Sequence, residues 1–261
     1  MVEHPLYGMS LPERGWVPSP GYVLRRYRVL QWVASLPPGE RALEIGCGPG
    51  ALLHDLAGLG YRCEAVETSE RALALAAEVF AGRPEVQVHA SPQPDWEARF
   101  DLLLAFEVLE HIEYDDQALG EWVEWLAPGG HLLISVPAHE RRWNPTDAWA
   151  GHYRRYESAR IRSLVSEAGL ELVSIECYGF PLANLLEAVR ARTFQRGAVD
   201  DRTQATAASG VERSVERRMW PLQTSLAGEL SMQVLCRLQD AFLDTELGNG
   251  FIAVARKPSS G

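Results

Sequence analysis

The sequence predicts an α/β protein built on a doubly wound, mostly parallel sheet of seven strands. Three observations support this prediction. Short apolar runs alternate with segments of helical spacing, as in repeated βαβ units. The run FDLLLAF at residues 100–106 is continuously apolar, which is typical of a central strand covered on both faces. A glycine-rich turn, GCGPG at residues 46–50, follows the first strand and opens a helix.

The N-terminal segment, residues 1–39, is expected to form a helical cap. Ser19 and Pro20 are residue types preferred at the N-cap and the first position of a helix. Apolar residues then recur at helical spacing as far as the Pro-Pro-Gly sequence at residues 37–39, which ends the helix.

Six strands are expected in the following core. They lie at residues 42–45, 62–67, 86–89, 100–106, 132–136 and 172–177. Helical spacing marks the connections, with helices expected around residues 52–59, 70–79, 122–126 and 161–168. The Pro-Gly-Gly sequence at residues 128–130 is expected to separate a helix from the fifth strand.

Residues 181–247 interrupt this alternation and are expected to form a helical insertion. A polar stretch at residues 197–210 is expected to be mobile, and a stripe from Leu226 to Phe242 recurs at helical spacing. We expect this stripe to be core, with an acceptor-pocket wall or a homodimer contact as the alternatives. The last strand is expected at residues 250–256, so the core comprises residues 40–180 and 248–258.

Composition excludes several classes of protein. The 261 residues carry a formal net charge of -10, which argues against nucleic acid as a partner because phosphate binding needs a basic face. No apolar run approaches the roughly 20 residues of a membrane span. The four cysteines lie far apart and are expected to be buried free thiols, which indicates a cytoplasmic protein.

Four motifs then occur in a fixed order. They are ALEIGCGPGALL, the carboxylate Glu67 after the second strand, FDLLLAFEVLEHI and LAPGGHLLISVP. Together they resemble class I S-adenosylmethionine-dependent methyltransferases, in particular a bacterial group of small-molecule enzymes with a leucine-glutamate-histidine step after strand four. The resemblance covers roughly residues 20–180 and the final strand, which in that family lies antiparallel beside strand six.

Two other functions compete with this interpretation. Gly46, Gly48 and Ala51 also match the loose fingerprint G-x-G-x-x-A of an NAD-dependent oxidoreductase. However, Glu44 would place negative charge close to a diphosphate, whereas an acidic edge suits a cationic amino group and sulfonium. The second competitor is a non-catalytic protein of the same fold that binds S-adenosylmethionine without transferring its methyl group.

The resemblance implies a cofactor site, residue by residue. The backbone of Glu44, Gly46 and Gly48 is expected to hold the methionine part, with Cys47 as a small residue of the same loop. Glu67 is expected to bind the ribose hydroxyls, Thr68 to lie beside the adenine and Phe106 to lie under the cofactor, with core packing as the alternative for Phe106. Ala90 and Ser91 occupy the place where the family often has glycine and aspartate.

Two histidines are candidate catalytic bases, because a hydroxyl acceptor has to lose a proton and imidazole titrates near neutral pH. His111 follows strand four, and His152 lies in the loop after strand five that commonly closes over the acceptor in the family. A structural hydrogen bond is the alternative role for each.

The run Glu107-Val-Leu-Glu110-His111 also matches the E-x-x-E-H sequence that binds a divalent metal in ubiquinone-pathway O-methyltransferases and small-RNA 3′-end methyltransferases. The resemblance thus implies Mg²⁺ bound by Glu107, Glu110 and His111 as an option. In relatives without a metal, Glu107 lies at the cofactor edge and Glu110 begins a helix.

A ring-rich, basic loop indicates the kind of acceptor. It carries four arginines and four aromatic residues: Arg141, Arg142, Trp143, Trp149, Tyr153, Arg154, Arg155 and Tyr156. These side chains would suit an anionic or aromatic small molecule, unless the arginines pair with nearby carboxylates. Arg25, before the core, is expected either to reach the cofactor carboxylate or to lie solvated on a helix. We expect O-methylation, with N- and C-methylation open.

Overall fold

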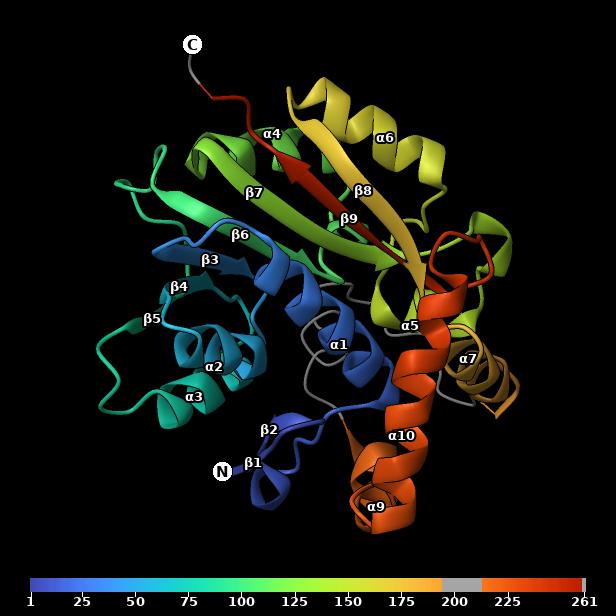
Figure 1. Ribbon diagram of the computed structural model, residues 1–261. Helices are drawn as coiled ribbons and strands as arrows, with labels where there is room; N and C mark the ends of the chain where they lie inside the picture. The colour runs from blue at the N-terminus through green and yellow to red at the C-terminus, as the bar shows by residue number, and fades with distance from the viewer. Residues whose placement is uncertain (194–212, 260–261) are drawn as a thin grey trace.

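Seven strands form the central sheet of this computed structural model, which describes residues 1–193 and 213–259 (Figure 1). The strands are β3 (Arg41–Ile45), β4 (Arg62–Val66), β5 (Val86–His89), β6 (Phe100–Phe106), β7 (Leu126–Pro137), β8 (Glu171–Tyr178) and β9 (Gly250–Arg256). Their order is β5-β4-β3-β6-β7-β9-β8; β9 pairs antiparallel with β7 and β8, and all other pairs of neighbours in this sheet are parallel. The predicted fold class is confirmed, including the antiparallel final strand.

Helices cover both faces of the sheet and separate two apolar cores. One core contains side chains of α1 (Pro20–Ser35), α2 (Ala51–Gly58) and α3 (Glu70–Val79), and the other those of α4 (Asp115–Trp125) and α6 (Ser158–Glu167). Successive residues of a strand point to opposite faces, so Leu102 and Leu104 of β6 enter the first core and Leu103 the second. This double burial explains why β6 is apolar without interruption.

The N-terminal segment is only partly helical, so the expectation of a helical cap over residues 1–39 is wrong for residues 1–19, where the sole helical element described is one 3-10 turn. Strands β1 (Val2–His4) and β2 (Gly8–Ser10) form an antiparallel hairpin, followed by the 3-10 helix η1 (Pro12–Arg14). The hairpin buries Tyr7, whose ring lies 5.4 Å from that of Trp220 in the insertion. Its apolar partner is thus more than two hundred residues away. The predicted cap of α1 is confirmed, because Tyr22 N donates to Ser19 Oγ at 3.2 Å.

The Pro-Gly-Gly sequence does not separate a helix from a strand, contrary to expectation. Helix α4 ends at Trp125 and β7 begins at Leu126, so residues 128–130 lie inside the strand. Gly129 N donates to Lys257 O, and Lys257 N donates to Gly130 O, both at 2.9 Å. Pairing with the chain that follows β9 therefore extends β7 through the glycines.

Short helices complete the loops and the insertion. They are the 3-10 helices η2 (Leu109–His111), η3 (Glu140–Arg142) and η4 (Asp240–Phe242), and the α-helices α5 (Pro145–Ala150), α7 (Leu182–Thr193), α9 (Ser214–Gln223) and α10 (Leu226–Gln239). The polar stretch expected to be mobile, residues 197–210, lies outside the described residues. None of the helices in the described ranges is long and apolar enough to span a bilayer. All four cysteines are buried free thiols, as predicted.

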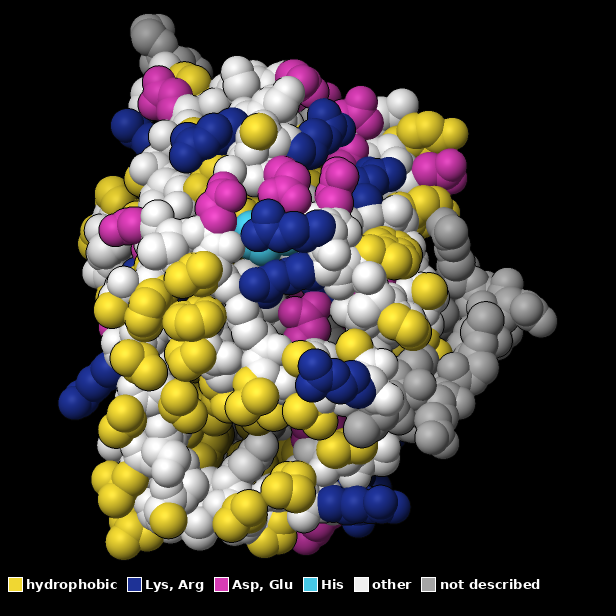
Figure 2. All heavy atoms as spheres, turned by 90° about the vertical axis from the view of Figure 1, so that its right-hand side faces the viewer, with side chains coloured by type: hydrophobic (Ala, Val, Ile, Leu, Met, Phe, Trp, Pro, Cys, Tyr) yellow, Lys and Arg dark blue, Asp and Glu magenta, His cyan; other side chains and the backbone are white. Residues whose placement is uncertain are grey.

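The α10 stripe is not core, so that expectation is wrong. Leu226, Leu230 and Val234 are 74%, 54% and 64% exposed, whereas Met232 and Cys236 are buried. Figure 2, which faces the side where α10 and α7 lie in Figure 1, shows hydrophobic side chains grouped on this surface. Helix α10 is apolar on two faces. It packs against the protein with the face that carries Met232 and Cys236 and leaves the predicted stripe exposed. The buried Gln239 fixes that choice, because its Nε2 donates to Leu24 O of α1 and its Oε1 accepts from Gly179 N, both at 3.1 Å.

Two substitutions in α10 test which face packs. We expect Met232→Ala to lower the free energy of unfolding by about 2–5 kcal/mol, because it leaves a cavity. Val234→Ala, the matched control on the exposed face, should change it by less than about 0.5 kcal/mol. Urea unfolding followed by circular dichroism measures both, and an effect of Val234→Ala as large as that of Met232→Ala would contradict the packing described.

Candidate active site

A cavity of about 1450 Å³ opens at the carboxyl ends of β3, β4 and β6. Helices α1, α5, α7 and α9 supply the remaining walls. The predicted site residues that line it are Glu44, Gly46, Cys47, Gly48, Glu67, Thr68, Phe106, Glu107, His111 and His152. Ala90 and Ser91 are not among the lining residues, although Pro92 is. The structure thus joins the expected cofactor and acceptor residues in one cavity, and the contacts of Ala90 and Ser91 stay a prediction.

The glycine loop after β3 requires glycine for steric reasons. Gly46 and Gly48 have φ angles of +69° and +56°, which L side chains rarely adopt. A Cβ atom on Gly46 would lie 2.6 Å from Val108 Cγ2. The loop therefore presents bare backbone to the cavity, as binding of an extended ligand along it requires.

Glu67 holds this loop in place. Its Oε2 accepts a hydrogen bond from Gly48 N and its Oε1 from Ser69 N, each at 2.8 Å. The carboxylate thereby links the loop after β3 to the loop after β4 while lining the cavity. Its expected contact with ribose hydroxyls stays a prediction.

Glu44 brings negative charge to the base of the loop. Its side chain is buried, and its Oε2 has no hydrogen-bond partner within the described part of the chain. Burial raises the pKa of Glu44 well above its usual value, whereas the nearby Arg25 lowers it. A buried carboxylate with one oxygen that lacks a partner favours a cationic group beside it and disfavours a diphosphate. The residues of this loop fit S-adenosylmethionine, whose amino and sulfonium groups are positive.

Glu107 ties three elements together at the edge of the cavity. Its Oε1 accepts from Ser135 Oγ of β7 at 2.9 Å and from Tyr178 Oη of β8 at 3.2 Å, and it lies 3.3 Å from Nη1 of Arg25 in α1. We call these four residues the Glu107 hub. The guanidinium of Arg25 also lies 5.7 Å from the centre of the Phe106 ring, within the range of a cation–π contact. Arg25 is therefore not solvated on the helix surface. Its expected contact with the cofactor carboxylate stays a prediction.

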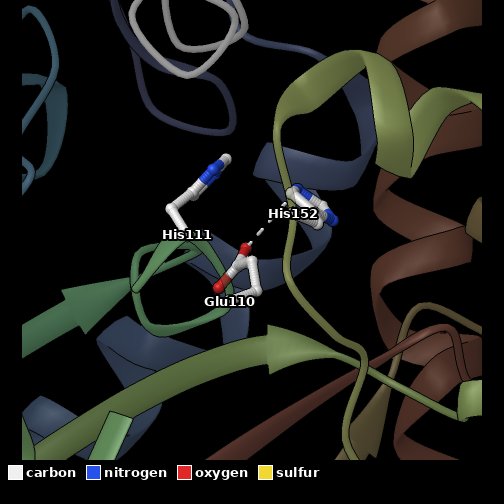
Figure 3. Close-up of side chains that lie close together, drawn as sticks. All are labelled: Glu110, His111 and His152. Atoms are coloured by element: carbon white, nitrogen blue, oxygen red, sulfur yellow. Dashed lines mark ion pairs between the residues drawn. The ribbon is translucent and has the colours of Figure 1, made fainter. Parts of the chain in front are cut away.

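A second group lies opposite, formed by Glu110, His111 and His152 (Figure 3). Glu110 and His111 come from η2 after β6, and His152 comes from the loop after α5. The two imidazole rings lie 4.7 Å apart at 84°, and His152 Nε2 lies 4.0 Å from Glu110 Oε1. One donor atom of each residue lies within 4.8 Å of the other two. We call these residues the acceptor cluster.

Burial governs the charge of this cluster. Glu110 is fully buried, and neither carboxylate oxygen has a hydrogen-bond partner in the described ranges. Burial raises the pKa of Glu110 well above its usual value, and the charge of Glu107 adds to the rise. Burial, together with the charge of His152, lowers the pKa of His111 to about 3. His111 is therefore neutral at physiological pH.

Two arginines of the basic loop, Arg154 and Arg155, lie in internal ion pairs, as the alternative for that loop expected. Arg155 Nε and Nη2 donate to the two oxygens of the buried Asp147 at 2.9 and 2.8 Å, and Arg154 Nη1 lies 2.9 Å from Asp115 Oδ2. Asp147 also accepts from His152 Nδ1 at 3.0 Å. The contact between Asp147 and His152 was not predicted from the sequence. The five-residue spacing of the two residues, across the end of a short helix, was the available signal.

Comparison with known proteins decides the family. A family model described as a methyltransferase domain matches residues 22–175, more than half of the chain. The chain belongs to the class I S-adenosylmethionine-dependent methyltransferases. The resemblance is confirmed, S-adenosylmethionine is the cofactor, and the oxidoreductase interpretation is excluded.

Individual relatives agree with this family. A Mycolicibacterium smegmatis protein named "Probable S-adenosylmethionine-dependent methyltransferase" is 31% identical over 178 residues, which cover 62% of this chain and 66% of that relative. A "Ubiquinone biosynthesis O-methyltransferase" of Thiobacillus denitrificans is 28% identical over 138 residues, 49% of this chain and 59% of the relative. The match thus spans less than two thirds of either curated relative.

Solved structures share the fold. The N-methyltransferase NodS from Bradyrhizobium japonicum, in complex with S-adenosylhomocysteine, has a TM-score of 0.55 and 20% identity over 92% of this chain and 89% of that chain. Likeness at this level of identity shows the architecture and leaves the acceptor undetermined.

A glycine substitution tests the loop as the cofactor site. We expect Gly46→Ala to weaken S-adenosylmethionine binding at least about tenfold, because a Cβ atom would strain the backbone and displace Val108. The control is Gly58→Ala in α2, where an added Cβ meets nothing within 4 Å. Isothermal titration calorimetry measures both affinities, and equal affinity of Gly46→Ala and wild type would place the cofactor elsewhere.

Proposed function

We propose that this methyltransferase transfers a methyl group from S-adenosylmethionine to a hydroxyl oxygen of a small molecule. The observation that carries the proposal is that His111 and His152 of the acceptor cluster line the same cavity as the glycine loop, with Glu110 buried behind them. The relatives named "Ubiquinone biosynthesis O-methyltransferase" support oxygen as the atom methylated.

The three proposed parts of the chain are an N-terminal cap, the cofactor-binding core and the insertion of residues 181–247 as a wall of the acceptor pocket.

The proposed chemistry needs alignment and removal of one proton. The bound cofactor supplies a methyl group on a good leaving group. The backbone of the glycine loop and Glu67 orient the cofactor, while the rings of Tyr22 and Phe106 exclude water. His152 Nε2 receives the proton of the hydroxyl as the oxygen attacks, and neutral His111 offers a hydrogen bond without repelling the imidazolium that forms.

The walls of the acceptor side favour an aromatic molecule. Trp149, Leu186, Val189 and Met219 line the cavity beyond the cluster. Arg190 lies over the Trp149 ring, 5.9 Å from its centre, and lines the same cavity. A ring beside a guanidinium suits an aromatic acceptor that bears a negative charge. Internal pairing of Arg154 and Arg155 excludes them from this role.

A histidine substitution tests the proposal. We expect the wild type to methylate 3,4-dihydroxybenzoate, an aromatic anion with two hydroxyls, and His152→Gln to lower kcat by about 100-fold or more with S-adenosylmethionine affinity unchanged. The control is His131→Gln in the middle of β7, outside the residues that line the cavity, which should retain activity. Formation of methylated product is followed by mass spectrometry. A loss below threefold in His152→Gln would contradict the role of His152, and cofactor binding without transfer to any hydroxyl acceptor would favour the non-catalytic alternative.

We also propose that the acceptor cluster binds a divalent cation. The structure does not gather the ligand set expected from the sequence, because Glu107 turns into its own hub and His152 replaces it. The partnerless oxygens of Glu110 are the supporting observation. One carboxylate and two imidazoles suit Mn²⁺, Fe²⁺ or Zn²⁺ better than Mg²⁺, which prefers oxygen ligands. A cation bound here would occupy His152 Nε2 and so take over the role of base from that nitrogen, because polarising the acceptor hydroxyl would itself favour loss of its proton.

Calorimetric titration tests the cation. We expect Zn²⁺ to bind at one site per chain more tightly than Mg²⁺, and Glu110→Gln to remove this binding. Glu157→Gln is the matched control, since Glu157 belongs to a separate cluster with His139 and Glu246. Loss of binding in Glu157→Gln alone would assign the cation to that other cluster. Full activity after exhaustive chelation would contradict a role of the cation in the reaction.

A further inference from the structure

We propose that Asp147 is a positioning residue for His152 and that Glu187 of the insertion holds it in place through Arg155. The inference rests on the proposed function only for its effect on turnover. We call Asp147, Arg155 and Glu187 the positioning chain. It connects α7 to the imidazole that faces the acceptor.

The hydrogen bond between Asp147 and His152 selects one tautomer. Asp147 Oδ1 lies 3.0 Å from His152 Nδ1. Both oxygens of Asp147 also accept from the guanidinium of Arg155, as expected of an ionised carboxylate. An ionised carboxylate only accepts, so Nδ1 carries the hydrogen and Nε2 keeps its lone pair. That lone pair then lies on the side of Glu110 Oε1, 4.0 Å away.

Asp147 cannot turn away from this contact. It occupies the third position of α5, where its Oδ2 accepts from the backbone N of Asn144 at 2.9 Å in a capping box. Arg155 binds both of its oxygens, and His152 N donates to Asp147 O at 3.0 Å. Every direction open to the carboxylate is therefore occupied by a donor, which fixes the imidazole as well.

Glu187 completes the chain from the insertion. Its Oε1 lies 2.5 Å from Arg155 Nη2 and accepts from Asn144 Nδ2 at 3.3 Å. Arg155 is buried and has five N–H donors, so the two oxygens of Asp147 do not satisfy all of them. Without Glu187, Arg155 would keep Asp147 as its only carboxylate, and both Arg155 and Asn144 would lose a contact that locates the loop carrying His152.

If Asp147 served only to bind arginine and stabilise the fold, its loss should affect turnover no more than the loss of Asp115. Asp115 is also buried and binds two arginines, with Oδ1 2.9 Å from Arg160 Nη2 and Oδ2 2.9 Å from Arg154 Nη1. No contact joins Asp115 to His152 among the described residues. Asp115→Asn is therefore the matched control for Asp147→Asn.

The tautomer of His152 is measured directly by two-bond ¹H–¹⁵N NMR of histidine-labelled protein, with His152→Gln assigning the signal. At a pH where the ring is neutral, we expect Nδ1 protonated and Nε2 unprotonated in the wild type and in Asp115→Asn. In Asp147→Asn the preference should be lost or reversed. A wild-type ring protonated at Nε2, or the same tautomer in Asp147→Asn as in the wild type, would overturn the inference.

Turnover is measured separately with 3,4-dihydroxybenzoate. We expect Asp147→Asn and Glu187→Gln to lower kcat by about 10- to 100-fold while KM changes less than threefold, and Asp115→Asn to keep kcat within twofold. Equal losses in Asp147→Asn and Asp115→Asn would reduce Asp147 to a structural role. If the wild type methylates no hydroxyl acceptor, the proposed function fails, but the NMR result still decides whether Asp147 positions His152.

Discussion

The carboxylate of Glu107 is the contact on which both halves of the cavity depend. It receives Ser135 from β7, Tyr178 from β8 and Arg25 from α1, while its own N–H donates to Ser135 O at 2.9 Å. These contacts hold its backbone at a φ of +56°, a conformation that non-glycine residues rarely adopt. The chain therefore leaves β6 sharply and enters η2, which brings Glu110 and His111 opposite His152. The same carboxylate keeps Arg25 over the Phe106 ring. Glu107 therefore positions both the Arg25–Phe106 wall of the cavity and the acceptor cluster.

The two halves of the site are built differently. The proposed cofactor half consists of residues around one glycine loop, and Glu67, which follows the neighbouring strand, accepts from Gly48 N of that loop. The acceptor half is formed by side chains from η2, the loop after α5 and helix α7, which meet only in the folded protein. A local motif can therefore specify the cofactor, whereas the acceptor depends on packing between distant segments. The insertion contributes to that packing through Glu187.

The sequence predicted the parts of the fold that depend on local patterns and missed those that depend on distant contacts. Apolar runs, helical spacing and the glycine loop located the sheet, and the Ser19 cap of α1 was predicted correctly.

The N-terminal hairpin was missed because Tyr7 packs against residues of α9. The wrong face of α10 was chosen because both faces are apolar, and contacts with distant segments, those of Gln239 among them, decide between the faces. Glu107 was grouped with Glu110 and His111 because the spacing suggests one cluster, whereas its positive φ turns it toward Arg25. The pairing of Asp147 with His152 involves a turn that residue spacing alone does not define.

A crystal structure of the protein with S-adenosylhomocysteine tests the central claim most directly. The account predicts the homocysteine part along Gly46 and Gly48, and the sulfur facing the space enclosed by Glu110, His111 and His152. The Asp147–His152 hydrogen bond should be retained in that complex. A ligand bound outside the glycine loop, or a sulfur separated from His152 by the Phe106 ring, would contradict the account.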